Sequence, residues 1–253
     1  MMIKYYEVIS SNHVLRGMIH EGKNKIPIIL VHGYFSSNKI GPHRLYFQIA
    51  DILNRLGYTI LRIDLSGMGE SDGNIERIEF DDHVNDLLIV TKALMEYKKS
   101  DYIHYIGHCV GCCNVLKSVI NRLETVKSIT LISPFMPSEH KFVDLLLGEE
   151  NYKRLMNEGI IYRKGLACKK SFIDAGYLID DKVIIEQCNR RNLEIFLSEK
   201  DELVDLQESI EWTKRFSLSS KIIDEADHNF INLEARRRLL IMLRERFVRL
   251  KND

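Results

Sequence analysis

The sequence predicts an α/β fold, in which a mostly parallel central sheet carries helices on both faces. Three observations lead to this prediction. Short β-rich runs alternate with helical patterns from residue 27 onward, which is typical of a parallel sheet covered by helices. The runs at 27–33 and 58–64 are almost continuously apolar, as expected of strands buried on both sides. The chain has 253 residues, of which 45% are hydrophobic, and this is enough for one large core.

The first half of the chain supplies most of the predicted elements. IKYYEVIS (3–10) and HVLRGMIH (13–20) alternate polar and apolar residues, which predicts an antiparallel edge hairpin. Apolar residues at helical spacing predict helices over 43–56 and 80–97. Strands are predicted at YIHYIG (102–107) and SITLIS (128–133), with a helix over 110–123 between them.

The alternation stops after Pro134 and resumes near residue 191. Charge-rich helical pieces fill the interval, and then LEIFLS (193–198), a helix over 206–215, a weak strand near KIID (221–224) and a closing helix over 232–250 follow. We therefore predict a core formed by 1–134 and 191–253, with a lid or cap insertion at 135–190. The apolar residues of this insertion favour a substrate with an apolar or aromatic acyl chain, or they form a core of the lid itself. They are Phe142, Leu145, Leu146, Leu147, Ile160, Ile161, Tyr162, Phe172 and Tyr177.

Charge and cysteine usage narrow the class of protein. Lysine plus arginine equals aspartate plus glutamate at 36 each, which gives no sign of nucleic-acid binding. No apolar run approaches the roughly 20 residues that span a bilayer, and MMIKYYEVIS lacks the features of a signal peptide. Five cysteines without a disulfide-like spacing indicate reduced thiols, and no histidine pair accompanies them at metal-ligand spacing. We therefore expect a cytoplasmic protein without metal, cofactor, membrane or nucleic-acid partner.

The stretch Gly107-His108-Cys109-Val110-Gly111 lies between a predicted strand and a predicted helix. This is the context of a sharp turn that presents one reactive side chain at its apex. Glycines on both sides suit such a turn because the backbones approach closely there. The apex residue is Cys109, and a helix N-terminus next to it favours a thiolate. The stretch therefore predicts a reactive thiol.

These motifs together resemble the α/β-hydrolase family, whose pattern G-x-S-x-G appears here with Cys109 in the serine position. The resemblance covers nearly the whole chain: HGY (32–34), LRIDLSGMGESDG (61–73), GHCVG (107–111), SEKDELVD (198–205) and ADHNF (226–230) occur in the family's order. The stretch GPHRLYFQIADIL (41–53) and the segment after SPF (133–135) look most like the feruloyl and cinnamoyl esterase branch.

The resemblance implies a set of site residues. His228 stands where the family's catalytic histidine lies, and Asp201 stands where its acid lies, with Glu199, Glu202 and Asp205 nearby as surface charges or rival acids. By the same resemblance, the oxyanion hole consists of the backbone N–H groups of Tyr34 and Val110. Two further groups are expected to be structural: the turn residues Asp64, Gly67, Gly69 and Ser71, and the packed histidines His32 and His108.

Cys109 has two other interpretations. Cysteine is among the most buried residue types and often only packs, as it would in a non-catalytic hydrolase fold used as a binding module. Cys109-x-x-Cys112 at a helix start is also a thioredoxin-like redox arrangement, but that interpretation leaves HGY, KDELV and DHNF unexplained. Reversible oxidation of Cys109 by Cys112 remains open as a regulatory side effect. Cys113, Cys168 and Cys188 are expected to be inert.

We therefore expect acyl transfer through a Cys109-His228-Asp201 triad and an acyl-cysteine, with a small carboxylic ester or thioester as substrate, free or bound to a carrier. A cysteine that attacks a thioester keeps the acyl group at thioester energy, so amines, alcohols and thiols can accept it as well as water. Hydrolysis is the main expectation. An acyltransferase is the alternative, and the binding module is a further one. The oligomeric state is not readable from the sequence.

Overall fold

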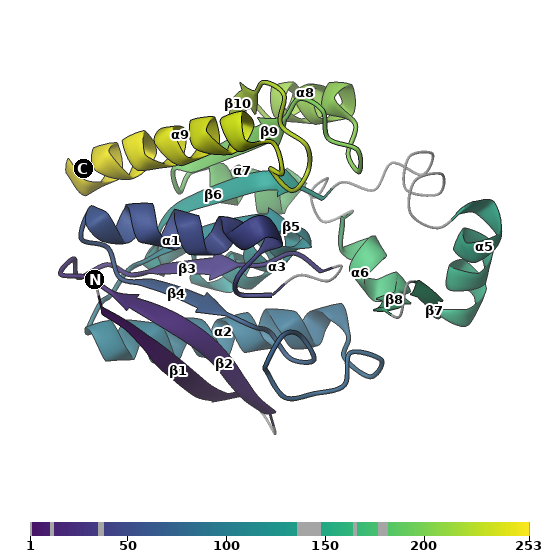
Figure 1. The fold of residues 1–253 in the computed structure, drawn as a ribbon, viewed down its shortest axis with the longest axis horizontal. Coiled ribbons are helices and arrows are strands. Elements are labelled where there is room, and N and C mark those ends of the chain that lie inside the picture. The colour runs from purple at the N-terminus through teal and green to yellow at the C-terminus, as the bar shows by residue number, and fades with distance from the viewer. Residues whose placement is uncertain are drawn as a thin grey trace.

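A computed structural model of the protein describes residues 2–10, 13–34, 38–135, 148–163, 166–176 and 182–252. Within them the main sheet has eight strands in the order β1-β2-β4-β3-β5-β6-β9-β10 (Figure 1). β2 pairs antiparallel with β1 and with β4, and each pairing from β4 to β10 in this order is parallel. The strands are β1 (Met2–Ser10), β2 (His13–Glu21), β3 (Ile28–Val31), β4 (Ile60–Ile63), β5 (Ile103–Cys109), β6 (Val126–Pro134), β9 (Leu193–Ser198) and β10 (Ser219–Ile223). The predicted α/β fold with its edge hairpin is therefore confirmed.

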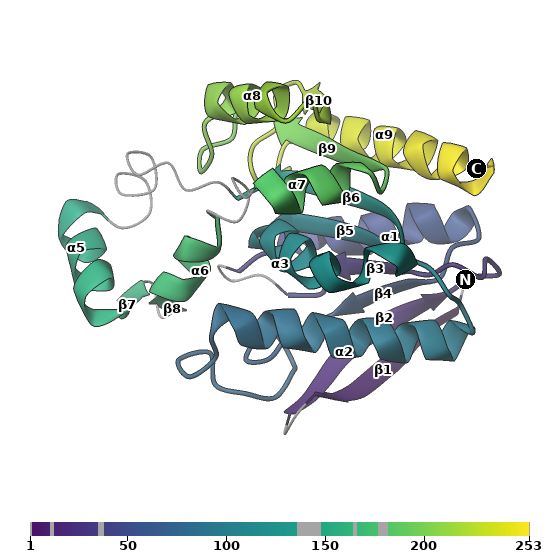
Figure 2. The same cartoon turned by 180° about the vertical axis from the view of Figure 1, so that it is seen from behind.

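Helices cover both faces of this sheet. Figures 1 and 2 show α1 and α9 on one face and α2, α3 and α7 on the other. The helices of the core are α1 (Leu45–Arg55), α2 (Phe80–Lys98), α3 (Val110–Val119), α7 (Lys182–Asn189), α8 (Leu206–Arg215) and α9 (Leu233–Asn252), with short 3-10 turns at η1 (Pro42–Arg44) and η2 (Ile120–Thr125).

The two-sided cover explains the continuous apolar runs. In β3, Ile28 and Leu30 pack into the buried cluster under α1 and α9, whereas Ile29 and Val31 pack into the cluster under α2 and α3. A strand that alternates between two buried faces needs an apolar side chain at every position. Burial of each such side chain stabilises the folded protein by roughly 1.5–3 kcal/mol. Because buried clusters lie on both faces of the sheet, the sheet is at the centre of the core.

Several element boundaries differ from the prediction by one or more residues, and two of them belong to the elements that flank the sharp turn. β5 continues two residues beyond Gly107, because His108 and Cys109 still pair with β6. The helix after the turn ends at Val119 rather than at 123, because the chain tightens into η2 and Arg122 leaves the helical region at a φ of −144°. The turn itself is therefore held on one side by a long strand.

The segment between β6 and β9 lies outside the main sheet. It contains α5 (Gly148–Glu158), the antiparallel pair β7 (Ile160–Arg163) and β8 (Leu166–Lys169), and α6 (Lys170–Asp174), before α7 contacts α3 in the core. The lid interpretation of 135–190 stays a prediction. Of its apolar residues, Ile161 and Phe172 are buried and Tyr162 is exposed. Phe142, Leu145, Leu146, Leu147 and Tyr177 lie outside the described residues.

Across the described part of the chain, every helix is too short or too polar to cross a bilayer.

Candidate active site

Cys109 occupies the sharp turn between β5 and α3. Its backbone has φ of +54° and ψ of −128°, a conformation that costs a residue with a side chain about 1–3 kcal/mol. The side chain is 5% exposed. A strained backbone held by a long strand and a helix keeps this thiol at one place, and such strain is concentrated at functional sites.

Glycines make the turn possible, as predicted. A β-carbon at Gly107 would lie 2.8 Å from Cys112 Cα, and one at Gly111 would lie 2.5 Å from the carbonyl oxygen of His32. The loop after β3 is equally close, since a β-carbon at Gly33 would lie 3.0 Å from Cys109 Cβ. Side chains at these positions would push the turn away from its neighbours.

His228 and Asp201 meet beside this turn. Nδ1 of His228 donates to Asp201 Oδ2 at 2.8 Å and lies 3.0 Å from Oδ1. The carboxylate is itself held, because Oδ1 also accepts the backbone N–H groups of Leu203 and Val204 at 2.9 Å each. A carboxylate can only accept, so it fixes the neutral His228 ring with its proton on Nδ1 and a lone pair on Nε2.

The charge state of His228 depends on two neighbours. Burial alone would lower the pKa of this imidazole, but the negative charges of Asp201 and Cys109 outweigh burial and raise the pKa well above its ordinary value. Nε2 is buried and makes no hydrogen bond to another described residue. The surroundings of this ring therefore favour its protonated, imidazolium form.

The three rival acids have other partners. Glu199 accepts the backbone N–H of Glu225 at 2.8 Å, and Asp205 caps the N-terminus of α8. Glu202 accepts the backbone N–H of His228 at 3.0 Å. Only Asp201 among these four carboxylates contacts the imidazole ring. The link from Glu202 to His228 carries no sequence signal, because it joins two loops that only the fold brings together.

A cavity of about 250 Å³ brings together Tyr34, Cys109 and His228 of the predicted site residues, and Asp201 and Val110 are not among its lining residues. It is lined by Gly33, Tyr34, Asn38, Gly41, Pro42, His108, Cys109, Leu203, His228 and Asn229. Tyr34 is thus at the cavity wall, and Val110 is the first residue of α3, where backbone N–H groups have no partner within the helix. The insertion reaches the same place: Phe172 stacks on Tyr34 with ring centroids 3.9 Å apart, and the Tyr34 hydroxyl donates to Ala167 O at 3.1 Å.

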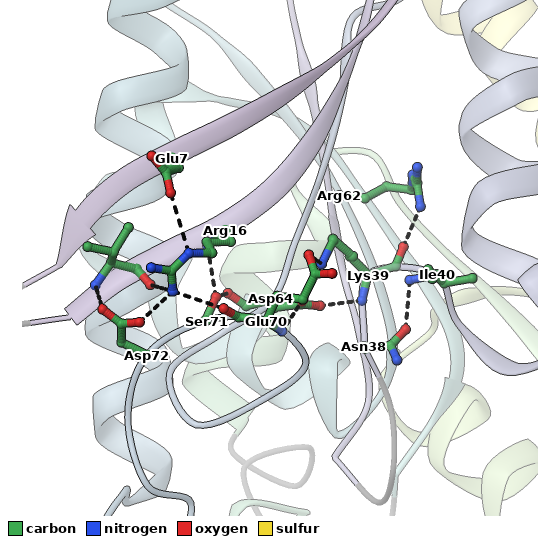
Figure 3. Close-up of polar contacts among 11 residues, drawn as sticks. Glu7, Arg16, Asn38, Lys39, Ile40, Arg62, Asp64, Glu70, Ser71 and Asp72 are labelled. Carbon is green, nitrogen blue, oxygen red and sulfur yellow. Dashed lines mark hydrogen bonds and ion pairs between the residues drawn. The ribbon is translucent and has the colours of Figure 1, made fainter.

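The predicted structural turn around Asp64 contacts Lys39, which follows the cavity residue Asn38 in the chain. Asp64 is fully buried and accepts hydrogen bonds from the backbone N–H groups of Lys39 and Glu70 (Figure 3). A β-carbon at Gly69 would lie 2.1 Å from Asp64 Oδ2, and the φ of Gly69 is +54°. Both observations explain why a glycine occupies this position. Ser71 Oγ donates to Asp64 O at 2.6 Å. The backbone of this turn therefore depends on one buried acid.

Lys39 is the member of this turn that sequence reasoning missed. Its ammonium group contacts Asp64 at 2.6 Å and Glu70 at 2.7 Å, although the residue is only 6% exposed. Burial alone would lower the pKa of Lys39, but the two carboxylates raise it above its ordinary value. Arg62 donates to Lys39 O at 2.6 Å. Figure 3 shows these contacts, which hold the loop that carries Asn38 and Gly41 along the cavity.

The remaining histidines and thiols near the turn are packed, as expected. His32 lies between Gly33 O and Leu65 N, and burial lowers its pKa. Cys112 and Cys113 donate to backbone carbonyls at 3.6 and 3.7 Å, and burial raises both thiol pKa values. Burial also raises the pKa of Cys188 to about 12. The five cysteines all lie in the described residues and form no disulfide there, and the oxidation of Cys109 by Cys112 stays a prediction.

The described residues hold no cluster of three or more histidine, cysteine, aspartate or glutamate side chains arranged as metal ligands.

Comparisons with known proteins fit this geometry. The family model described as "alpha/beta hydrolase fold" matches residues 26–175. Est1E from Butyrivibrio proteoclasticus, solved with ferulic acid bound, superposes with a TM-score of 0.81 at 19% identity, covering 98% of this chain and 100% of that one. Alpha/beta hydrolase domain-containing protein 10 from mouse superposes with a TM-score of 0.74 at 20% identity, covering 98% and 99%.

A curated relative is the probable lysophospholipase BODYGUARD 4 of Arabidopsis thaliana, which is 27% identical over 113 residues. That match covers 44% of this chain and 25% of the relative, so it spans about a quarter of the plant protein's length. The family model covers more than half of the chain, and the sharp turn and the His228 loop follow the carboxyl ends of two parallel strands, β5 and β10, and line one cavity. The chain therefore belongs to the alpha/beta hydrolase fold family.

Proposed function

We propose that this protein hydrolyses a carboxylic thioester or ester through an acyl-cysteine on Cys109. The observation that carries the proposal is that His228, hydrogen-bonded to Asp201, lines one cavity with the thiol of Cys109 on a strained turn. A nucleophile, a base and a group that orients the base are the three parts that acyl transfer needs. A cysteine that only packs in the core needs neither a base nor a group that orients the base.

The residues suggest how the two half-reactions proceed. His228 Nε2 takes the proton of the Cys109 thiol, and the thiolate attacks the carbonyl carbon of the substrate. The tetrahedral intermediate then expels the alcohol or thiol leaving group, which receives the proton from His228 Nε2. In the second half-reaction His228 removes a proton from water, the hydroxide attacks the acyl-cysteine, and the thiolate leaves as the carboxylic acid is released.

Backbone N–H groups would hold the negative charge that develops on the carbonyl oxygen. We assign this role to Tyr34 and Val110, because Tyr34 lines the cavity and Val110 begins α3. Donors of this kind contribute roughly 3–4 kcal/mol each to the transition state. Their orientation depends on the loop after β3, which Gly33 allows to lie against Cys109.

The acyl group remains broad in this proposal. Ferulic acid, bound by Est1E, is an aromatic carboxylic acid, and the plant relative is described as a probable lysophospholipase. Both descriptions belong to the chemistry of carboxylic acyl groups. They support a panel that contains aryl esters, alkyl esters and acyl thioesters.

Mass spectrometry of the intact protein tests the proposal. The protein is mixed with each member of the panel and stopped with acid within seconds, and a mass increase equal to the acyl group is expected, with peptide mapping to Cys109. A binding module would retain its original mass with every member of the panel. That result, with no free acid released, would contradict the proposed function.

Transfer to an acceptor other than water is the second candidate, and the cysteine itself favours it. Cys109→Ser would form an oxyester, which is less reactive toward amines than the wild-type thioester intermediate. We expect the serine variant to hydrolyse simple esters but to lose transfer from an acyl thioester to an added amine. The measurement is the ratio of amide to free acid for both forms. A wild-type ratio no higher than that of the serine variant would leave plain hydrolysis.

A further inference from the structure

A chain of three buried hydrogen bonds links the loop after β3 to the loop that carries His228. The N–H of Gly33 donates to the Tyr46 hydroxyl at 3.3 Å, this hydroxyl lies 2.7 Å from Nδ1 of His108, and Nε2 of His108 lies 2.9 Å from the carbonyl oxygen of His228. Tyr46 comes from α1 and His108 from β5. The chain thus joins four separate segments, and Gly33, His108 and His228 of this chain line the cavity.

The direction of each hydrogen bond in this chain follows from which of its atoms can donate and which can accept. A carbonyl oxygen only accepts, so Nε2 of His108 must be the donor to His228. Burial lowers the pKa of His108 to about 3, helped by the nearby His228, so the ring is neutral and Nδ1 is an acceptor. The Tyr46 hydroxyl then donates to Nδ1 and accepts from Gly33. The direction runs from Gly33 through Tyr46 and His108 to His228.

The burial of this chain makes each of its bonds consequential. Tyr46, His108 and His228 are 0%, 2% and 1% exposed. Water cannot replace a lost partner easily at such positions, and an unsatisfied buried group costs roughly 1–3 kcal/mol. The loops at both ends would therefore shift to recover a partner if one link were removed.

We propose that Tyr46 and His108 are positioning residues, which hold the Gly33–Tyr34 backbone and His228 in register around Cys109. This inference rests on the proposed function, because it assigns the oxyanion donor to the residue that follows Gly33. The loop at Gly33 lies close to Cys109, since a β-carbon at Gly33 would lie 3.0 Å from Cys109 Cβ, so a shift of this loop moves its backbone donors relative to the nucleophile. Loss of the Tyr46 hydroxyl would release the N–H of Gly33 and let the neighbouring donor turn away from the substrate oxygen.

The test compares Tyr46→Phe with Tyr58→Phe. Tyr58 is a matched control, because it is also buried under α1 and α9 and its hydroxyl donates to Phe247 O at 3.0 Å, outside the cavity lining. Hydrogen exchange followed by NMR is expected to show the Gly33 amide exchanging at least tenfold faster in Tyr46→Phe and unchanged in Tyr58→Phe. Equal Gly33 exchange in wild type and Tyr46→Phe would overturn the proposal without any substrate.

The kinetic arm separates positioning from a general loss of structure. Acylation by the best ester is expected to fall 10- to 100-fold in Tyr46→Phe, mainly in kcat, because oxyanion donors act on charge that develops in the transition state. Alkylation of Cys109 by iodoacetamide forms no oxyanion, so its rate is expected to stay within twofold. Equal losses in acylation and alkylation, or acylation as fast as in Tyr58→Phe, would overturn the positioning role.

A second substitution tests the link as a unit. His108→Phe keeps a ring at this position but removes both the acceptor of the Tyr46 hydroxyl and the donor to His228 O, so it is expected to slow acylation at least as much as Tyr46→Phe, and the double variant is expected to be no slower than His108→Phe. Additive losses in the double variant would contradict a single chain. If the wild type is acylated by no ester, the proposed function fails, whereas the Gly33 exchange still decides whether the hydrogen-bonded chain exists.

Discussion

Cys109→Ala is expected to abolish acyl transfer while the protein stays folded. Removal of an enzyme nucleophile costs roughly four to six orders of magnitude in kcat. Alanine keeps the β-carbon and therefore the same backbone strain at a φ of +54°, so the turn is neither relieved nor further strained. The measurement is turnover of the best ester, together with the mass of the protein after rapid mixing.

Cys188→Ala is the matched control for this variant. Cys188 is also a fully buried free thiol, but it lies in α7, outside the cavity lining. Its substitution is expected to leave turnover within twofold and to lower stability by about 1 kcal/mol. Full activity of Cys109→Ala would eliminate the nucleophile assignment. Equal ligand affinity of the wild type and Cys109→Ala, with no turnover by either protein, would instead indicate a binding module.

Elements defined by local periodicity are predicted well from this sequence. The strand at 193–198 and the helix at 206–215 are found as Leu193–Ser198 and Leu206–Arg215. Their boundaries carry local signals, such as Asp205 as the N-cap of α8. The end of α3 at Val119 has no comparable signal. It depends on how η2 leads the chain into β6, which is a tertiary effect.

The candidate site is predicted only in part, for a related reason. The order of motifs is enough to identify Cys109, Asp201 and His228 as candidates, because the family resemblance depends on the order of motifs in the sequence. The groups that hold them are not visible in this way. Lys39 meets Asp64 across 25 positions, and His108 meets His228 across 120. Such contacts depend on packing between segments, and a lysine or a tyrosine in the sequence gives no sign of its distant partner.

His228→Ala is expected to be as damaging as the loss of the nucleophile, at roughly four to six orders of magnitude in kcat. The variant loses both the base and the acid of the proposed cycle. It also loses the group that would take the proton of the Cys109 thiol, so alkylation of Cys109 by iodoacetamide at pH 7 is expected to slow by at least tenfold. Unchanged alkylation would show that His228 does not act on the thiol.

Asp201→Asn is expected to be less damaging than His228→Ala, and the geometry explains how it acts. Oδ1 of Asp201 accepts two backbone N–H groups, from Leu203 and Val204, so the amide oxygen of asparagine would take this place. Its NH₂ group would then face Nδ1 of His228, where Oδ2 now accepts at 2.8 Å. A donor there favours the ring tautomer with its proton on Nε2, which cannot accept the proton of Cys109. Loss of this orientation costs roughly 10⁴-fold in a comparable triad.

Glu199→Gln and Asp205→Asn are the controls for this variant. They change neighbouring carboxylates that do not touch the ring, so both should retain nearly full turnover. A larger loss in either control than in Asp201→Asn would move the role of the acid away from Asp201.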